Sequence, residues 1–220
     1  QSILVSGNTE ALGNNNLKKS FLLEYLNNQF WHGYVEVDEK QITHSIQYKY
    51  ILREDKADDI PEFGNDRIID IQDFKVGRLV LNDVWNHPGT VENVFFSSPF
   101  KNILLKKQAV NKALARPAKT FTHEFRVKAP VLEPGETLCI GGSAILFKNW
   151  DKARVQPMVK SGNWFTIRIN LSNDTFPFTY KYGVYNFKNK KFIRFEEGNN
   201  RLLLSPETNK TISIIHDGFA

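Results

Sequence analysis

Short runs of alternating apolar and polar residues recur along the chain and are separated by residues typical of turns. Residues 166–171 read Thr-Ile-Arg-Ile-Asn-Leu, and Phe121, Phe125 and Val127 alternate with polar neighbours. An alternation of period two predicts β-strands that bury one face. Residues 178–185 are rich in aromatic residues, which also favours a strand. Turn-forming groups follow these segments, at Gly162-Asn163, Asn173-Asp174, 198–200 and 207–210.

Much of this pattern occurs twice, with the second occurrence about 134 positions after the first. The matched groups are residues 4–7 with 138–141, the Tyr-Lys-Tyr triplets 48–50 and 180–182, the Glu, Gly, Asn and Arg residues at 62, 64, 65 and 67 with those at 196, 198, 199 and 201, and the single residues Leu12, Trp31 and Asp83 with Leu146, Trp164 and Asp217. The offset falls to 132 at the triplets and then recovers. Small changes in loop length between duplicated domains produce such a shift. The sequence therefore predicts two copies of one domain.

The boundary between the copies lies in a stretch with little periodicity. Residues 106–119 hold four Ala, five basic residues and Pro117, which is typical of a linker. We predict a first domain at residues 1–105, a linker at 106–120 and a second domain at 121–220. Residues 17–26 fit an amphipathic helix, but Pro157 in the matching part of the second copy argues against one. The predicted fold is all-β, with two immunoglobulin-like antiparallel β-sandwiches in tandem.

Composition removes several classes of protein. Hydrophobic residues make up 41% of the chain, which is enough for a packed core and excludes intrinsic disorder. No apolar run approaches the ~20 residues that span a bilayer. The single cysteine, Cys139, cannot form an internal disulfide, and the sequence starts inside a predicted strand at residues 3–5 with no signal peptide. We therefore expect a reducing, cytoplasmic location or a piece of a longer protein. The net charge is +5, but outside the linker basic and acidic residues are interspersed, so we expect no nucleic-acid surface.

Known catalytic patterns are missing from the sequence. There is no Gly-x-Ser-x-Gly turn and no P-loop. The five histidines have no metal-ligand spacing, and no carboxylate pair is distinguished as a glycosidase acid and nucleophile. We therefore predict no catalytic residue, no metal site and no cofactor in these 220 residues.

The second copy carries a set of motifs that points to a family. Residues 146–150 end in Trp150, Trp164 opens an alternating strand, and the Tyr-Lys-Tyr triplet is followed by Phe-Glu-Glu-Gly-Asn-Asn-Arg at 195–201. These motifs resemble the starch-binding domain of carbohydrate-binding module family 20. The copy differs from the family pattern at Phe195, which replaces a tryptophan, and in the turn before Trp150, which lacks a glycine.

The resemblance implies binding of α-1,4-glucans such as starch, glycogen, malto-oligosaccharides and cyclodextrins. Trp150 and Phe195 would pack flat ring faces against the C–H patches of glucose. Lys181, Glu196 and Asn200 would bind the hydroxyl rims. A shallow site of this kind is expected to bind weakly, because association entropy offsets much of a small contact area.

The first copy retains only part of this site. Asn15 or Asn16, depending on a one-residue gap, takes the position of Trp150, and Pro61 takes the position of Phe195. Lys49 and Glu62 match Lys181 and Glu196, so the first copy keeps polar positions without an aromatic platform. We therefore predict a degenerate site there.

A narrower resemblance lies in the tail of the first copy. Residues 82–86 and 92–100, together with the tandem arrangement, resemble the N-terminal region of two-module 4-alpha-glucanotransferases of the disproportionating-enzyme-2 type, in glycoside hydrolase family 77. This implies that the modules direct a catalytic barrel, absent from these residues, to a polysaccharide or heteroglycan. The alternative is a structural, dimerising or docking unit with little sugar affinity. Exposure of Trp150 and Phe195 on one face would favour binding, and burial of both would favour the structural role.

Overall fold

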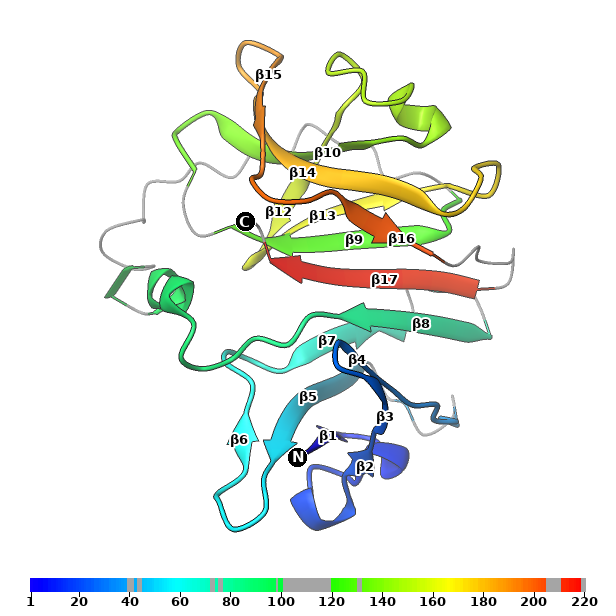
Figure 1. Cartoon of the computed structure of the whole chain (residues 1–220), viewed down its shortest axis with the longest axis vertical. Coiled ribbons are helices and arrows are strands. Elements are labelled where there is room, and N and C mark those ends of the chain that lie inside the picture. The colour runs from blue at the N-terminus through cyan, green and yellow to red at the C-terminus, as the bar shows by residue number, and fades with distance from the viewer. Residues whose placement is uncertain are drawn as a thin grey trace. The chain divides into compact units, whose positions relative to one another are not determined.

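The computed structural model describes residues 1–38, 42, 45–71, 74, 77–97, 99–100, 120–129, 132–204 and 211–218. Within these residues the chain folds into β-strands and short 3-10 turns (Figure 1), which confirms the predicted all-β class. The chain divides into two compact units, residues 1–75 with 85–91 and residues 76–84 with 92–220. The predicted linker lies outside the described residues except for residue 120, and the boundary that it sets stays a prediction.

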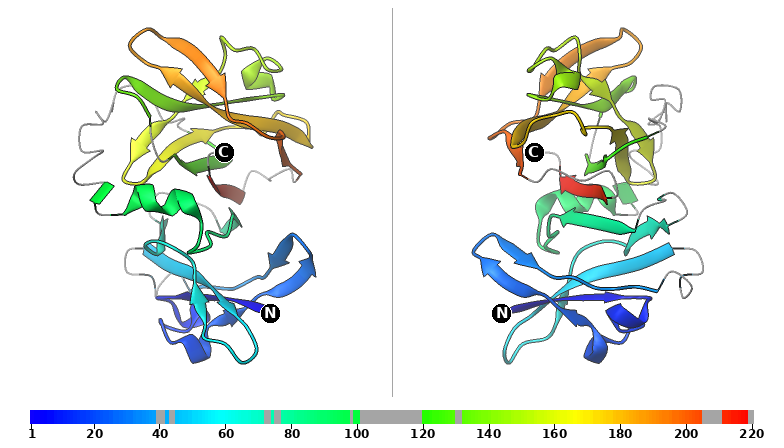
Figure 2. Two further views of the ribbon diagram at one scale, coloured as in Figure 1. Left: turned by 60° about the vertical axis from the view of Figure 1, so that its left-hand side comes forward. Right: turned by 90° about the vertical axis from the view of Figure 1, so that its right-hand side faces the viewer.

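The second unit contains two layers of strands, which Figure 2 shows from two further sides. In the first layer β10 and β14 are central, β11 pairs with β10, and both β15 and β16 pair with β14. All of these pairings are antiparallel. The strand bounds are β10 Glu136–Gly142, β11 Gln156–Pro157, β14 Phe178–Asn186, β15 Lys191–Phe195 and β16 Arg201–Leu203.

The second layer of this unit has the strand order β12-β13-β9-β17-β8. The bounds are β12 Val159–Ser161, β13 Trp164–Ile169, β9 His123–Lys128, β17 Thr211–Gly218 and β8 Arg78–Asp83. β17 runs parallel to both of its neighbours, β9 and β8. The alternation of apolar and polar residues does not distinguish parallel from antiparallel pairing, so the sequence did not predict this feature.

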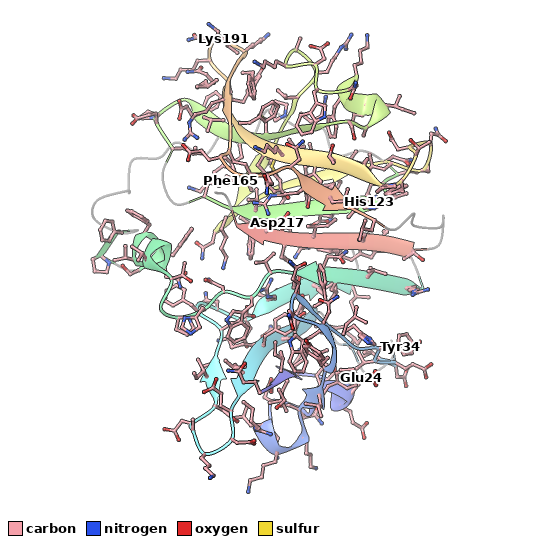
Figure 3. All side chains as sticks on the ribbon, viewed as in Figure 1. Glu24, Tyr34, His123, Phe165, Lys191 and Asp217 are labelled. Carbon is pink, nitrogen blue, oxygen red and sulfur yellow. The ribbon has the colours of Figure 1, made fainter. Side chains whose placement is uncertain are left out.

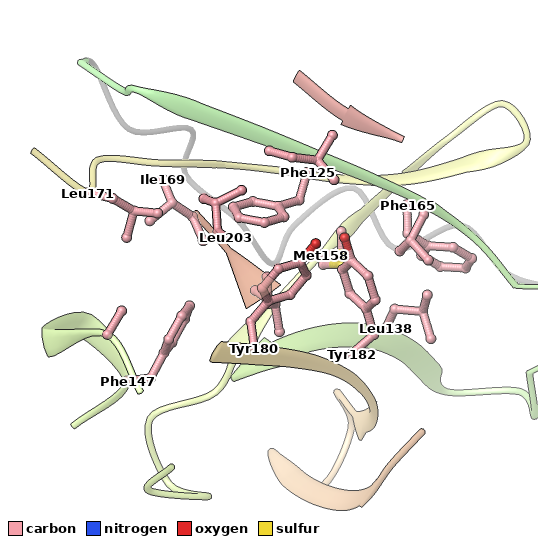
Figure 4. Packing of buried hydrophobic residues seen from close by; sticks show 14 of the residues in the cluster. Phe125, Leu138, Phe147, Met158, Phe165, Ile169, Leu171, Tyr180, Tyr182 and Leu203 are labelled. Atoms are coloured by element: carbon pink, nitrogen blue, oxygen red, sulfur yellow. The ribbon is translucent and has the colours of Figure 1, made fainter. Parts of the chain in front are cut away.

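The core of the second unit lies between its two layers (Figure 4). Phe125 and Val127 of β9 are fully buried, as their alternation predicts. Tyr180 and Tyr182 of β14 enter the same core from the opposite layer. Burial of such side chains stabilises a fold by ~1.5–3 kcal/mol each, and this cluster holds the first layer in a fixed position under the site described below.

Strand β8 belongs to the second unit, although the repeat assigns its residues to the first copy. The carboxylate of Asp83 on β8 and Nδ1 of His216 on β17 form a buried hydrogen bond. Val84, which follows β8, donates its backbone N–H to the carbonyl oxygen of His216. The last strand of the first copy therefore serves as an edge strand in the sheet of the second.

The first unit has a five-stranded antiparallel sheet in which β1 and β5 are central, and a separate two-stranded hairpin. The bounds are β1 Ser2–Gly7, β2 Phe21–Leu22, β5 Ser45–Arg53, β6 Ile60–Pro61 and β7 Arg67–Asp70 in the sheet, and β3 Glu24–Asn27 and β4 Phe30–His32 in the hairpin. Residues 17–26 form a 3-10 turn and two strands rather than an amphipathic helix.

Strand register corrects the alignment of the two copies by one residue near their beginnings. Gly7 is opposite Tyr48, and Gly142 is opposite Tyr180, so Gly7 is equivalent to Gly142 at an offset of 135. Leu12 correspondingly matches Phe147, not Leu146. Leu12 and Phe147 are both buried, whereas Leu146 is 41% exposed. A one-residue slip exchanges the two faces of a strand, and chance similarity of neighbouring residues concealed it in the sequence.

Candidate functional site

Trp150 is presented by a loop with an unusual backbone. The 3-10 turn Ile145–Phe147 leads into Lys148, Asn149 and Trp150, whose φ angles are 46°, 52° and 69°. Three consecutive residues other than glycine in the left-handed region are uncommon, and they persist only where the surrounding structure holds them. Here the backbone N–H of Trp150 donates to the carbonyl oxygen of Gly142 at 2.7 Å. The loop therefore fixes the position of the indole.

Phe195, at the end of β15, lies next to this indole. The ring centroids of Trp150 and Phe195 are 5.6 Å apart, and the ring planes are inclined by 84°. The Phe195 ring lies over Gly141, where an added Cβ would come within 3.2 Å of two ring atoms. Both aromatic residues are only half-buried. The second unit thus presents two accessible rings at a steep angle to each other.

Glu196 turns away from this surface and into the fold. Its carboxylate accepts two hydrogen bonds from Arg201, both at 2.9 Å, and one from the backbone N–H of Tyr182 at 3.0 Å. The side chain of Glu196 is only 1% exposed. The carboxylate therefore serves as an internal anchor for the turn that follows Phe195.

Asp217 continues this buried network behind the turn. The hydroxyls of Tyr180 and Tyr182 donate to the Asp217 carboxylate at 3.0 and 2.9 Å, and Arg201 lies 3.3 Å from it. Burial raises the pKa of Asp217, and Arg201 and the two hydroxyls offset this only in part. Burial by itself lowers the pKa of Arg201, but its hydrogen bonds to Glu196 and the two neighbouring carboxylates raise it above its ordinary value. Arg201 therefore stays charged.

Lys181 holds the backbone of the same turn. Its Nζ donates to the carbonyl oxygens of Glu196 at 3.2 Å and of Gly198 at 2.6 Å. Residues 197–200, including Asn200, are exposed. Lys181 thus fixes the segment that carries Phe195 on one side and Asn200 on the other.

The first unit repeats this scaffold without the rings. Asn15 donates its backbone N–H to the carbonyl oxygen of Gly7 and has a φ of 61°, so Asn15, rather than Asn16, is equivalent to Trp150. Glu62 accepts hydrogen bonds from Arg67 at 3.0 and 2.7 Å.

Pro61 and Lys49 of the first unit occupy the positions of Phe195 and Lys181 but have different chemistry. Pro61 lies in β6 where Phe195 lies in β15. Lys49 forms an ion pair with Asp66 at 3.1 Å, instead of binding backbone carbonyl oxygens as Lys181 does. The glutamate–arginine pair therefore persists in a copy that has lost both aromatic residues, which favours a structural role for that pair.

The structure brings all five predicted residues of the second copy to one region. Trp150, Phe195 and Asn200 are accessible there, whereas Lys181 and Glu196 already have partners within the protein. Sequence reasoning missed Arg201 as the partner of Glu196, although the Glu-x-x-x-x-Arg spacing occurs in both copies and could have indicated it. The sequence suggested residues 185–192 only as an alternative surface and did not place Phe192 in the site, although its ring centroid is 4.6 Å from that of Phe195.

The described part of the chain contains neither a metal-binding cluster nor a membrane-spanning helix. No group of three or more His, Cys, Asp or Glu side chains within it could hold a metal ion. Among the same residues, no helix is both long enough and apolar enough to span a membrane.

Comparison with known proteins identifies the family. The starch-binding domain family, carbohydrate-binding module family 20, matches residues 1–77 and again residues 120–215. The chain therefore belongs to this family, and it carries two copies of the domain. The second match contains Trp150, Phe195 and the Glu196–Arg201 pair.

One curated relative is the 4-alpha-glucanotransferase DPE2 of Oryza sativa subsp. japonica. It is 27% identical over 202 residues, which cover 83% of this chain and 20% of the relative. The chain thus spans about a fifth of that protein's length.

Similar solved structures include the family 20 module of the maltotetraose-forming amylase from Pseudomonas saccharophila, with 17% identity, a TM-score of 0.35, and coverage of 42% of this chain and 97% of that one. A glucoamylase from Hypocrea jecorina has 14% identity and a TM-score of 0.37 over 50% of this chain and 18% of its own.

Proposed function

We propose that the second unit binds α-1,4-glucans at the surface formed by Trp150 and Phe195. The observation that carries this proposal is the contact of two half-buried rings, inclined by 84°, on a loop held by a backbone hydrogen bond and on a strand. Aromatic faces pack against the C–H patches of sugar rings. Because the two ring faces are inclined, they suit consecutive glucose units of a curved chain better than one flat surface would.

Polar contacts take a smaller part in this binding. The amide of Asn200 lies in the exposed turn and can both donate to and accept from sugar hydroxyls. Lys181 and Glu196 support the site without contacting the sugar, because their polar atoms bind the backbone of the turn and of β14. Hydrogen bonds that exchange with water contribute only ~1 kcal/mol each, so the rings supply most of the affinity.

The test is calorimetric titration of the chain and of Trp150→Ala with β-cyclodextrin. We expect Trp150→Ala to weaken binding by more than about tenfold, since loss of a central aromatic contact commonly costs ~2 kcal/mol or more. Lys49→Ala, at the matching strand position of the first unit, should bind as the parent does. Both variants must keep the parent's unfolding temperature. Equal affinity of Trp150→Ala and the parent would show that glucan binds elsewhere.

We further propose that the tandem modules direct a 4-alpha-glucanotransferase to its polysaccharide or heteroglycan substrate. The partial similarity to the rice enzyme supports this proposal, and the catalytic domain of the parent protein would be the partner. In the full-length protein, Trp150→Ala should lower the rate of transfer on glycogen and leave the rate on maltose unchanged. Equal loss on both substrates would contradict a targeting role. These 220 residues alone should release no glucose from maltose or maltotriose.

A structural or docking role is the second candidate, for the first unit only. That unit lacks both rings, and three apolar side chains of its β3–β4 hairpin, Tyr25, Leu26 and Phe30, are each more than half exposed. Exposed apolar groups of this kind are found at protein contacts. Sedimentation of the chain and of a Leu26→Ser/Phe30→Ser variant tests the role: a parent that self-associates while the variant does not would support it, and identical monomers would contradict self-association.

A further inference from the structure

Phe192 on β15 reaches the same surface because of a β-bulge. Asn186 and Tyr185 of β14 pair with Lys191 and Phe192, but the next pair is Val184 with Arg194, and Ile193 is left over. Phe192 and Phe195 therefore face positions two apart on β14, Tyr185 and Gly183. A bulge inserts one extra residue into a strand, so residues on either side of it that are an odd number of positions apart point to the same face of the sheet. The two phenylalanines, three apart in sequence, consequently share one face of the sheet.

Glycine residues make room for both phenylalanine rings. A Cβ on Gly183 would come within 2.7 Å of the carbonyl oxygen of Arg194 and within 2.9 Å of the Phe192 ring, and a Cβ on Gly141 would approach Phe195. The rings of Phe192 and Phe195 have centroids 4.6 Å apart with planes inclined by 53°. Trp150 of the loop after residues 145–147 and Phe195 and Phe192 of β15 thus form a continuous row of three rings, which we call the aromatic row. Lys191 marks the outer end of the hairpin that carries Phe192 (Figure 3).

The first unit offers an internal comparison. Ser6 occupies the position equivalent to Gly141, and Ile51 occupies that of Gly183, because Ile51 is opposite Pro61 as Gly183 is opposite Phe195. The copy without rings therefore also lacks the glycines beneath them. A glycine in the middle of a strand is destabilising by ~0.5–1 kcal/mol relative to alanine. In the second unit two such glycines leave the space in which the rings of Phe192 and Phe195 lie.

We propose that Phe192 forms an additional glucan subsite at one end of the aromatic row, so that the second unit accommodates a longer α-glucan chain than the Trp150–Phe195 pair alone. This inference rests on the proposed function of that pair. Phe192 is half-buried, so one part of its ring is accessible while the rest packs on Gly183 and Phe195. The steps between ring centroids, 5.6 and 4.6 Å, are about the size of one sugar ring. A disaccharide would fill the first pair only, and a longer chain would also contact Phe192.

The experiment compares maltose and maltoheptaose as ligands of the parent chain, Phe192→Ala, Phe192→Leu and the control Ile193→Ala. Ile193 is the exposed apolar neighbour on the same strand. We expect both Phe192 variants to lose about tenfold in affinity for maltoheptaose and less than about twofold for maltose. Phe192→Leu keeps an apolar side chain without a flat ring, so it separates stacking from simple filling of space. Ile193→Ala should bind both ligands as the parent does.

Other results would separate this inference from the proposed function. If the parent binds neither ligand, the proposed function fails, and the subsite fails with it. If Trp150→Ala abolishes binding while both Phe192 variants bind maltoheptaose as the parent does, the subsite is overturned and the Trp150–Phe195 site stands. An equal loss for maltose and maltoheptaose would also overturn the subsite, because Phe192 would then act only by supporting Phe195. Unfolding temperatures within a few degrees of the parent's establish that each variant is folded.

Discussion

Glu196 illustrates how a residue chosen for ligand chemistry can serve the fold instead. Its carboxylate is almost completely buried, and Arg201 and the backbone of Tyr182 bind its oxygens. Loss of the Glu196 charge would leave Arg201 with Asp217 as its remaining carboxylate partner, and each hydrogen bond to a charged group contributes ~1.5–3 kcal/mol. Glu62 and Arg67 make the same contacts in the first unit, so the pair belongs to the architecture that the two copies share.

We therefore predict that Glu196→Gln lowers the free energy of unfolding of the second unit by about 2 kcal/mol. Urea denaturation followed by tryptophan fluorescence measures this change. Glu197→Gln is the matched control, since Glu197 is the exposed neighbour and surface substitutions usually remain within ~0.5 kcal/mol. A change of less than about 1 kcal/mol in Glu196→Gln would contradict the anchoring role.

A second prediction concerns His123 at the start of β9. Burial lowers the pKa of His123 to about 4, from an ordinary value of 6.5. The folded state therefore holds the neutral ring, while the unfolded state takes up a proton below pH 6.5. Stability that is present above pH 6.5 is lost as the pH falls from 6.5 towards 4, by up to about 3 kcal/mol from this residue.

Stability curves at pH 7 and pH 4.5 test this linkage. His123→Phe should be destabilised less between the two pH values than the parent, because it has no proton to take up. The comparison of parent and variant removes contributions from the other titrating groups. An identical pH dependence in the two proteins would exclude His123 as a source of the acid sensitivity.

Cys139 provides a third prediction at this scale. Burial raises the pKa of its thiol to about 12, and the thiolate is the reactive form of cysteine. A thiol reagent such as 5,5′-dithiobis(2-nitrobenzoate) should leave the native chain unmodified at pH 8 and should titrate one thiol in urea. Rapid reaction of the native chain would mean that β10 opens readily.

At the scale of elements, most strands could be predicted from the sequence, but their exact pairing could not. The alternation at Phe125 and Val127 lies in β9, and that of residues 166–171 overlaps β13, because period two reports directly on a half-buried strand. The offset of 135 near Gly7 and Gly142 depends on register, which is a property of two strands. A single run of sequence does not contain it.

The bulge at Ile193 explains why the site was only partly predictable. Strict alternation places Phe192 and Phe195 on opposite faces, and the extra residue puts them on the same face. Trp150, Lys181, Phe195, Glu196 and Asn200 were found through motifs, and the structure assembles them. Lys181 and Glu196 serve the fold and not the surface because they bind the carbonyl oxygen of Gly198 and the side chain of Arg201. Residue type alone does not reveal such partners.

For the whole molecule, the repeat predicts two domains that fold independently, but the position of β8 links the two copies. β8 precedes the predicted linker in sequence, yet it pairs with β17 over residues 78–83 and 211–216. The stretch 106–120 has a composition typical of exposed linkers, which are preferred sites of proteolytic cleavage. Brief trypsin treatment should therefore cut between residues 105 and 121 and yield two pieces.

Those two pieces should stay together in native buffer, because the β8–β17 ladder joins them, and separate in denaturant. Size-exclusion chromatography of the nicked protein, followed by electrophoresis of its peak, measures this. A matched nicked sample with Asp83→Ala and Leu81→Asp should separate more readily. Clean separation of the parent pieces in native buffer would contradict the pairing of β8 with β17, and cutting mainly at other sites would contradict the predicted boundary.

The same edge strand has a practical consequence for protein engineering. A starch-affinity tag cut at the repeat boundary, from residue 121 to residue 220, would lack β8 and would uncover the backbone N–H and C=O groups along one side of β17. An uncovered strand of this kind, carrying Ile212, Ile214 and Ile215, is a template for pairing between molecules. A cassette that begins at residue 77 retains the covering strand, and we expect it to be the more soluble fusion partner at equal concentration.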